Sequence, residues 1–491
     1  MPNVLEERKI EQSRKTFNEG INTHVDKLSH FLNVERKLFR PNLITEAVNI
    51  LTGHAVISQN MASDSMKNTF IEERRQRGMD VKEGYVICVD GRLANLLLAG
   101  KNVNIWEEPA SLFNTKKDSD GSTIVESDKL TEVITKTAQD DREMFEMVFA
   151  HTSLTTDHVC GKAAALSKQE GRPLFGLTGR DLAKKNIEML ESEQIPAITN
   201  TYNKARKDAN LDPLKQVAVS ALIDTDTYGM ILNFGNTEQG KGELSTTALL
   251  EKSELKNQMI EKLGGDLQFA KYKDTFDNPN FFKSLYKDIV KVTGALLDGI
   301  DGFAPVTEYI NTHYSNLTDI QKKAFIFSMA RTIAMQYTTG LSYLPAGEHP
   351  HHRFAEHDEG FATMTTEGGQ ALIGRFDASG QSFGVTTSSK EEAQAQVRDV
   401  VLPLLDKSHK VDGGRHTIFV SAPCPELENV AKENAIKKIE ELMTNLLEVN
   451  EVKKRIQKGN LLLVPVLVDE GNGEIMDIPI LPMLKPHSHR G

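Results

Sequence analysis

The stretch EGYVICVDGR, residues 83–92, decides the fold of the central part of the chain. Its apolar run from Tyr85 to Ile87 is typical of a buried strand, and polar residues with a glycine follow it as a loop would. MFEMVFAHTS, residues 144–153, has the same design, although its first half could equally finish a helix that begins near Lys129. We therefore expect two buried strands that both end in polar side chains.

Strands and helices mix along the rest of the chain, which indicates an α/β or α+β fold. QVAVSALIDTDTYGMILNFG, residues 216–235, holds two apolar runs around a turn and resembles a hairpin. The remaining expected elements are a helix over 161–171, mostly helix over 244–340, a hairpin over 361–376, a helix over 390–407, a strand over 415–424, a long helix over 425–458 and closing strands over 460–482.

The length of 491 residues exceeds what one hydrophobic core usually supports, so two or three domains are expected. Residues 1–76 are polar and rich in helix formers, and we expect a helical N-terminal domain there. The sequence pattern changes near residue 77 from one typical of helices to one typical of strands, and a segment rich in Pro, Gly and His follows residue 340. These changes predict further domains over 77–340 and 341–491.

Composition excludes several classes of protein. The net charge of −11 does not suit a nucleic-acid surface, which needs clustered Lys and Arg. No apolar run is long enough to span a bilayer, and the charged N-terminal residues lack the apolar core of a signal peptide, so we expect a cytoplasmic protein. Three cysteines are too few for a disulfide framework, and thiols kept reduced are often metal ligands or catalytic groups.

The polar residues at the two expected strand ends form a candidate metal site. Cys88, Asp90 and Arg92 alternate after the first strand, so an extended chain places them on one side. His151 ends the second strand, and Cys160 precedes a probable helix start, where the helix dipole favours a thiolate. Two thiolates and one imidazole suit Zn²⁺ with a fourth position for water. Each residue alone is most simply a buried thiol or a hydrogen-bonded imidazole, but the ordered set favours the metal site.

This order of residues resembles the β-class carbonic anhydrases, in which Cys, His and Cys hold zinc and an Asp–Arg pair follows the first Cys. That class usually reads H-x-x-C, whereas eight residues separate His151 from Cys160 here. The longer gap and the phrase CVDGRL look more like the carboxysome shell branch of the class. The resemblance implies Cys88, His151 and Cys160 as zinc ligands, with Asp90 and Arg92 as catalytic residues. His158 is a rival ligand, and we prefer His151 because it follows an apolar run, as Cys88 does.

The resemblance also implies a function and an architecture. The function is reversible hydration of CO₂ to bicarbonate and a proton by a zinc-bound hydroxide, which Asp90 orients while Arg92 fixes Asp90. The architecture is a helical N-terminal domain over 1–76, a catalytic zinc domain over 77–340, and a C-terminal domain over 341–491 that is a degenerate copy of the catalytic one without a metal site. Such families form homo-oligomers. Residence in a carboxysome, with shell or Rubisco-associated partners, does not follow from these residues.

Two other readings of the site stay open at this point. One is a different zinc hydrolase, which the absence of the H-x-E with P-C-x-x-C and H-E-x-x-H signatures weakens. The other is a non-catalytic structural or regulatory relative with a structural zinc. The histidines near residues 349–357 are most simply a solvated loop, and Cys424 is most simply a buried thiol, although it follows an expected strand much as Cys88 does.

Overall fold

A computed structural model of the chain describes residues 19–31, 33, 72–88, 104–107, 111–139, 143–152, 154, 179–225, 227, 229–235, 242–265, 281–339, 359–365, 369–375, 381–385, 390–403, 415–424, 429–469, 475–479 and 481. The chain divides into two compact units. The central unit comprises Lys67–Tyr272 and Leu285–Gly347, and the terminal unit comprises Met1–Met66, Lys273–Ser284 and Glu348–Gly491. The division into three domains that the sequence suggests stays a prediction.

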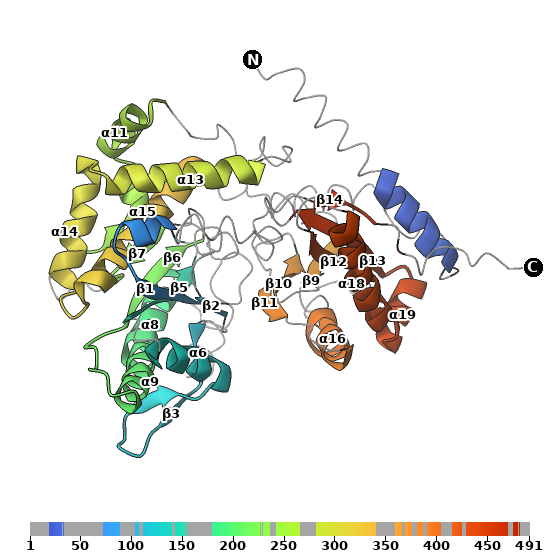
Figure 1. Cartoon of the computed structure of the whole chain (residues 1–491), viewed down its shortest axis with the longest axis horizontal. Coiled ribbons are helices and arrows are strands. Elements are labelled where there is room, and N and C mark those ends of the chain that lie inside the picture. Colours follow the sequence, from blue (N-terminus) through green and yellow to red (C-terminus); the bar gives the residue numbers. More distant parts are fainter. Residues whose placement is uncertain are drawn as a thin grey trace, which may run out of the picture. The chain divides into compact units, whose positions relative to one another are not determined.

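A six-stranded sheet in the order β2-β1-β5-β6-β7-β8 forms the middle of the central unit (Figure 1). Its strands β2, β1, β5 and β6 are parallel, and β7 and β8 add antiparallel pairs at one edge. The strands are β1 (Val81–Ile87), β2 (Asn104–Glu107), β5 (Glu143–Thr152), β6 (Ala218–Asp224), β7 (Met230–Leu232) and β8 (Leu244–Ser245).

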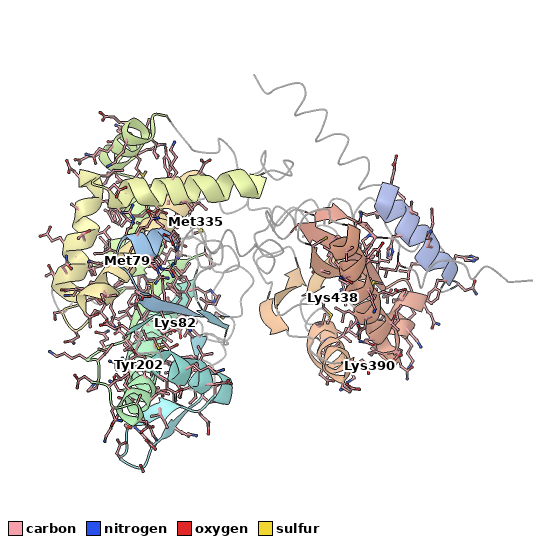
Figure 2. The ribbon with its side chains drawn as sticks, in the orientation of Figure 1. Met79, Lys82, Tyr202, Met335, Lys390 and Lys438 are labelled. Atoms are coloured by element: carbon pink, nitrogen blue, oxygen red, sulfur yellow. The ribbon has the colours of Figure 1, made fainter. Side chains whose placement is uncertain are left out.

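Helices cover both faces of the parallel strands, which explains why β1, β5 and β6 are buried almost along their whole length. Val86, Val148 and Leu222 lie on one face and share a core with α6, α8 and α9, to which Tyr202 of α9, labelled in Figure 2, also belongs. On the other face, Phe145 contacts Phe325 of α15 at a ring distance of 5.3 Å. These helices are α6 (Asp128–Gln139), α8 (Gly179–Met189), the π-helical turn η4 (Leu190–Gln194), α9 (Ile195–Asp208) and α15 (Asp319–Thr339).

The rest of the described central unit consists of short helices and one small hairpin. The hairpin pairs β3 with β4. A network of polar side chains joins α10 and α15 to the turn between β6 and β7. The elements are β3 (Thr115–Lys117), β4 (Thr123–Val125), α10 (Thr246–Leu250), α11 (Ser253–Leu263), α13 (Phe281–Leu297), the 3₁₀ turn η5 (Asp301–Phe303) and α14 (Ala304–His313).

The terminal unit has a second six-stranded sheet, in the order β11-β10-β9-β12-β13-β14. Strands β9, β12 and β13 are parallel, and the other pairs are antiparallel. Lys390 of α16, labelled in Figure 2, forms an ion pair of 2.6 Å with Glu448 at the end of α18. The elements are β9 (Glu359–Thr365), β10 (Gly369–Arg375), β11 (Gln381–Val385), α16 (Lys390–Gln396), the π-helical turn η9 (Val397–Val401), β12 (Arg415–Cys424), α18 (Asn429–Leu447), α19 (Asn450–Gln457), β13 (Leu461–Asp469) and β14 (Ile475–Asp477).

A helix over 19–31 belongs to the terminal unit and covers part of the edge of β13. Strand β14 pairs with β13 only at Leu467 and Val468, so no strand among the described residues lies beside the first half of β13 on that side. There the imidazole Nε2 of His24 donates a hydrogen bond of 2.9 Å to the carbonyl oxygen of Leu463. The helix therefore supplies a hydrogen-bond donor to a backbone carbonyl at a strand edge that would otherwise be open.

The structure confirms the expectation of a mixed fold with a sheet rich in parallel strands. The hairpins over 216–235 and 361–376 and the strand over 415–424 are confirmed as well. The long helix over 425–458 is wrong in one respect, because the chain turns at Glu448 and Val449 and divides it into α18 and α19. The helix expected over 161–171 lies outside the described residues. No helix in the described part of the chain is long and apolar enough to span a membrane.

Candidate metal centre

The carboxyl ends of β1 and β5 bring together two of the predicted zinc ligands. The strands are adjacent and parallel, with Val86 opposite Val148. Continuing that register by two residues places Cys88, which directly follows β1, opposite Ala150 and one residue out of step with His151. Neighbouring strands lie about 4.8 Å apart and rise about 3.3 Å per residue, so the two Cα atoms are about 6 Å apart. Both side chains are buried, with exposed fractions of 4% for Cys88 and 2% for His151.

The faces of the sheet restrict how these two side chains can act together. Alternation puts Cys88 on the face of Val86 and Val148, and puts His151 on the opposite face with Phe149. The two groups can therefore share an ion only beyond the carboxyl edge, where side chains of both faces turn over the strand ends. That edge is also where open α/β sheets usually bind ligands.

The other predicted site residues lie outside the described part of the chain. These are Asp90 and Arg92, which follow β1, together with Cys160 and the rival ligand His158. Within the described ranges, no three side chains of His, Cys, Asp or Glu form a group that could hold a metal ion. Within the described residues, neither Cys88 nor Cys424 forms a disulfide bond, and both are buried. The structure thus places Cys88 and His151 at the ends of adjacent strands, and the other three residues of the site, Asp90, Arg92 and Cys160, stay a prediction.

Two hydrogen bonds fix the end of β5 that carries His151. On one side, Ser111 donates from its hydroxyl to the carbonyl oxygen of Phe149 at 2.6 Å. Ser111 is fully buried and has a φ of 58°, a left-handed conformation that non-glycine residues seldom adopt. On the other side, a carboxylate oxygen of Asp224, the last residue of β6, accepts from the amide of Leu154 at 3.2 Å. The backbone groups that these side chains bind, those of Phe149 and Leu154, both lie within three residues of His151.

A buried ionic cluster lies on the other side of β1, beneath α15. Glu83 forms ion pairs with Arg331 at 3.1 Å and with Arg74 at 3.3 Å, and the three side chains are almost completely buried. Ser328 donates a hydrogen bond to Glu83, and Arg331 donates to the hydroxyl of Tyr85. Arg74 also donates to the carbonyl oxygen of Val81 at 2.9 Å. Arg331 lies in α15, and Arg74 lies in the helix that ends before β1. The two ion pairs with Glu83 therefore join both helices to β1.

Burial and charge act in opposite directions on the cluster. Burial by itself raises the pKa of Glu83, but Arg331 and Arg74, with the hydrogen bonds from Ser328 and Tyr85, outweigh it and hold the pKa below its usual value. Burial raises the pKa of Tyr85 to about 12. The structure therefore keeps Glu83 ionised and Tyr85 neutral at neutral pH.

A second buried carboxyl group, that of Glu146, occupies the space above Gly84 on the neighbouring strand. A Cβ atom at position 84 would stand 1.9 Å from one carboxyl oxygen of Glu146, so only glycine fits there. Burial raises the pKa of Glu146 well above its usual value, and the charge of Glu83 raises it further. Glu146 thus differs from Glu83, since no cation among the described residues lowers its pKa, and burial favours its protonated form.

Glu83, Glu146 and Asp224 are not among the site residues predicted from the sequence, although a signal for each is present. Glu83 and Glu146 are lone carboxyl groups inside strands that are otherwise buried and mainly apolar. Charged residues of this kind are almost never fully buried unless they are paired. Asp224 is an acid at the last position of an apolar strand, as Asp90 is close to one. A carboxyl side chain inside a buried strand or at its end was therefore the signal for all three residues. Of the residues with this signal, only Asp90 was predicted as a site residue.

The chain was compared with protein families and with curated proteins once its strand ends were defined. No family model matches it. No curated protein matches it either.

Proposed function

We propose that this chain is a zinc-dependent carbonic anhydrase that interconverts CO₂ and bicarbonate. The observation that carries the proposal is the position of Cys88 and His151. They come from distant parts of the sequence, are both buried, and stand at the carboxyl ends of neighbouring parallel strands. A thiolate and an imidazole brought together in this way suit Zn²⁺, and Cys160 is proposed as the third ligand.

The residues have distinct roles in this proposal. Cys88, His151 and Cys160 hold the ion, and two thiolates neutralise its charge. A zinc ion with an open position supplies acidity, because it lowers the pKa of bound water to about 7. Asp90 accepts a hydrogen bond from that water and so fixes its orientation, and Arg92 holds the Asp90 carboxylate by a charge-assisted pair. His151 is preferred to His158 because it stands at the end of β5, next to the end of β1.

The terminal unit is proposed to be a degenerate copy of the catalytic one. Its strands β9, β12, β13 and β14 have the same order and directions as β1, β5, β6 and β7 of the central unit. The turns also agree in length, since Ile223 pairs with Met230 and Val468 pairs with Ile475. A cytoplasmic homo-oligomer is part of the same proposal, with residence in a carboxysome as its alternative.

The burial of Cys88 and His151 favours one alternative function, a closed structural zinc site in a non-catalytic protein. Structural zinc sites have four protein ligands and no open position, whereas catalytic sites keep one for water. The two functions differ in what Asp90 does. In an enzyme Asp90 acts on the bound water, and in a structural site it has no water to orient.

Metal analysis of the purified chain together with stopped-flow CO₂ hydration tests the proposal. We expect about one zinc per chain and measurable hydration. Asp90→Asn is expected to retain zinc and to lose activity at least about 100-fold, since it removes the group that positions the attacking water. Zinc without activity in the unaltered chain would favour the structural alternative. Absence of zinc after refolding with Zn²⁺ would end both.

A matched pair of histidine variants tests the choice of ligand. His151→Gln is expected to lose zinc, while His158→Gln retains it. Circular dichroism and thermal melting of the two variants show whether each remains folded. The reverse result, with zinc lost only from His158→Gln, would assign the ion to the rival residue.

A further inference from the structure

Residues at the end of β6 hold the backbone that follows β5 by hydrogen bonds. Strands β5 and β6 are parallel, with His151 opposite Ile223 and Thr152 opposite Asp224. Beyond this register, the amide of Thr225 donates to the carbonyl oxygen of Thr152 at 2.9 Å. Asp224 then accepts from the amide of Leu154 at 3.2 Å. The carboxylate therefore bonds to the backbone three residues after His151.

A polar network holds the Asp224 carboxylate in turn. Its second oxygen accepts from the Thr227 hydroxyl at 2.8 Å, and that hydroxyl is 3.0 Å from the hydroxyl of Thr247 in α10. The side-chain amide of Gln336, in α15, donates to the Thr247 hydroxyl at 2.8 Å and to the carbonyl oxygen of Thr227 at 3.0 Å. The oxygen of that amide accepts from Thr246 at 2.6 Å, which fixes its orientation.

The turn between β6 and β7 is built for close approach of this network. A Cβ atom at Gly229 would stand 2.1 Å from the Thr247 hydroxyl and 3.0 Å from the Gln336 amide. Asp224, Gln336 and Thr246 are buried, with exposed fractions of 5% or less. Buried polar side chains whose partners are all fixed hold one conformation, and such outer partners orient metal ligands in proteins.

We infer that Asp224 is a positioning residue for the metal centre. It fixes the backbone at the end of β5, so that His151 stays aligned with Cys88 over the carboxyl edge of the sheet. Thr227, Thr247 and Gln336 carry the rigidity of α10 and α15 to Asp224. The inference rests on the proposed function, because it gives Asp224 a role toward the same ion.

Variants of Asp224, examined by two measurements, test this inference. Asp224→Ala removes the carboxylate that accepts from Leu154 and Thr227, and the affinity for Zn²⁺, measured by competition with a chromophoric chelator, is expected to fall about 10- to 100-fold. Asp224→Asn retains an oxygen that can accept from Leu154, so it is expected to recover most of the affinity. Hydrogen exchange, read by mass spectrometry on peptides over 143–154, is expected to be faster in Asp224→Ala than in the unaltered chain.

Two further variants separate positioning from a general loss of stability. Thr227→Val has nearly the same volume and removes the hydrogen bonds of the Thr227 hydroxyl to Asp224, Thr247 and the amide of Gly229. The bond from Leu154 to Asp224 is retained, so we expect a smaller loss of zinc affinity with the fold retained. Asp469→Asn alters the last residue of β13, the strand that occupies the place of β6 in the other sheet, and is expected to leave zinc affinity unchanged.

The outcomes distinguish this inference from the proposed function. If the unaltered chain binds zinc and hydrates CO₂, but Asp224→Ala binds zinc equally tightly, the inference alone is overturned. A loss of affinity that is equal in Asp224→Ala and Asp224→Asn, with no change in exchange over 143–154, also overturns it. If the unaltered chain binds no zinc, the proposed function is overturned and the role toward the ion goes with it.

Discussion

The two sheets of this protein have a common arrangement of strands but different chemistry at their strand ends. In each, three parallel strands that are neighbours in the sheet are followed by an antiparallel one. The central sheet has Cys88 after β1 and His151 at the end of β5. In the terminal sheet, Cys424 ends β12, the strand in the place of β5. The comparison shows that the strand order provides an edge, and that only the residues placed there can make it a site.

The sheets also differ in the polar groups that they bury. The central sheet buries Glu83 with two arginines and, nearby, the uncharged carboxyl of Glu146. The terminal sheet has the neutral imidazole of His24 against β13. Removing one partner of a buried ion pair strongly destabilises the fold, whereas a buried group that is neutral makes the stability depend on pH. The two units should therefore fail under different conditions.

The largest difference is expected between the two buried thiols. Cys88→Ser is expected to abolish zinc binding and to reduce CO₂ hydration more than about 100-fold, because a hydroxyl is a poor ligand for Zn²⁺ in place of a thiolate. Cys424→Ser is the matched control, since Cys424 is equally buried at a strand end, and it is expected to leave both unchanged. Zinc content by mass spectrometry and stopped-flow kinetics measure the two effects. Equal losses in both variants would show that the two strand ends do not differ in function.

Removal of the charge of Glu83 is expected to cause the largest loss of stability. Glu83→Gln leaves Arg331 and Arg74 buried without a counter-charge, and breaking such a pair costs about 3–5 kcal/mol. Glu72→Gln is a suitable control, because Glu72 pairs with Arg75 where both side chains are more than half exposed. Exposed pairs of that kind contribute little. Urea denaturation followed by circular dichroism compares the variants, and equal midpoints for both would contradict the assigned role of the cluster.

A pH-dependent effect of intermediate size is expected at His24. Burial lowers the pKa of His24 to about 4, against an opposing hydrogen bond to Leu463. The unfolded chain takes up a proton near pH 6.5 and the folded one does not, so stability is full above that pH and falls as the pH drops toward 4. The loss is about 3 kcal/mol.

Hydrogen exchange over residues 19–31 between pH 4 and pH 8 measures the effect at His24. His24→Gln is expected to remove the pH dependence, because its amide can donate to Leu463 without taking up a proton. His30→Gln, at an exposed position of the same helix, is expected to behave like the unaltered chain. If His24→Gln retains the full dependence, another group is responsible.

An effect of the opposite sign is expected at Glu146. The pKa of Glu146 is raised in the folded state, so the unfolded chain loses a proton first as the pH rises. The contribution of Glu146 to stability is therefore complete at about pH 4 and declines as the pH increases. Glu146→Gln is expected to match the unaltered chain at pH 4 and to exceed it in urea denaturation at pH 8. A variant that is less stable at pH 8 would contradict this account.

The sequence was sufficient to predict the strands that carry the candidate site and the ends of these strands, because short-range patterns determine them. It did not predict β2, β3, β4 or β11. The apolar runs before Cys88 and around His151 and the turn after Asp224 all lie in windows of about ten residues. The same local patterns predict both halves of the candidate site, since a strand end is where a buried run meets polar residues. Adjacency of β1 and β5 does not follow from their order along the chain, because β2, β3 and β4 come between them and β2 pairs with the other side of β1.

Features that depend on distant partners could not be predicted from the sequence. Arg331 lies in a helix far along the chain, and nothing around Glu83 indicates which cation it will meet. The apolar face of the helix over 19–31, with Ile21, Val25 and Leu28, shows that it must be covered but not by which unit. The turn at Val449, between α18 and α19, contains neither glycine nor proline, so no local signal predicts it. We attribute the separation of the two helices to tertiary packing.

The pairing of Glu83 with Arg331 has a consequence for the order of events on the ribosome. The two residues are 248 positions apart along the chain. At a synthesis rate of about 5–20 residues per second, Arg331 is made about 12 to 50 s after Glu83. Throughout that interval the Glu83 carboxylate can pair with Arg74 but lacks Arg331, the second cation, which α15 supplies. A pause or truncation before residue 331 is therefore expected to leave the central sheet without this contact and more open to chaperones and proteases.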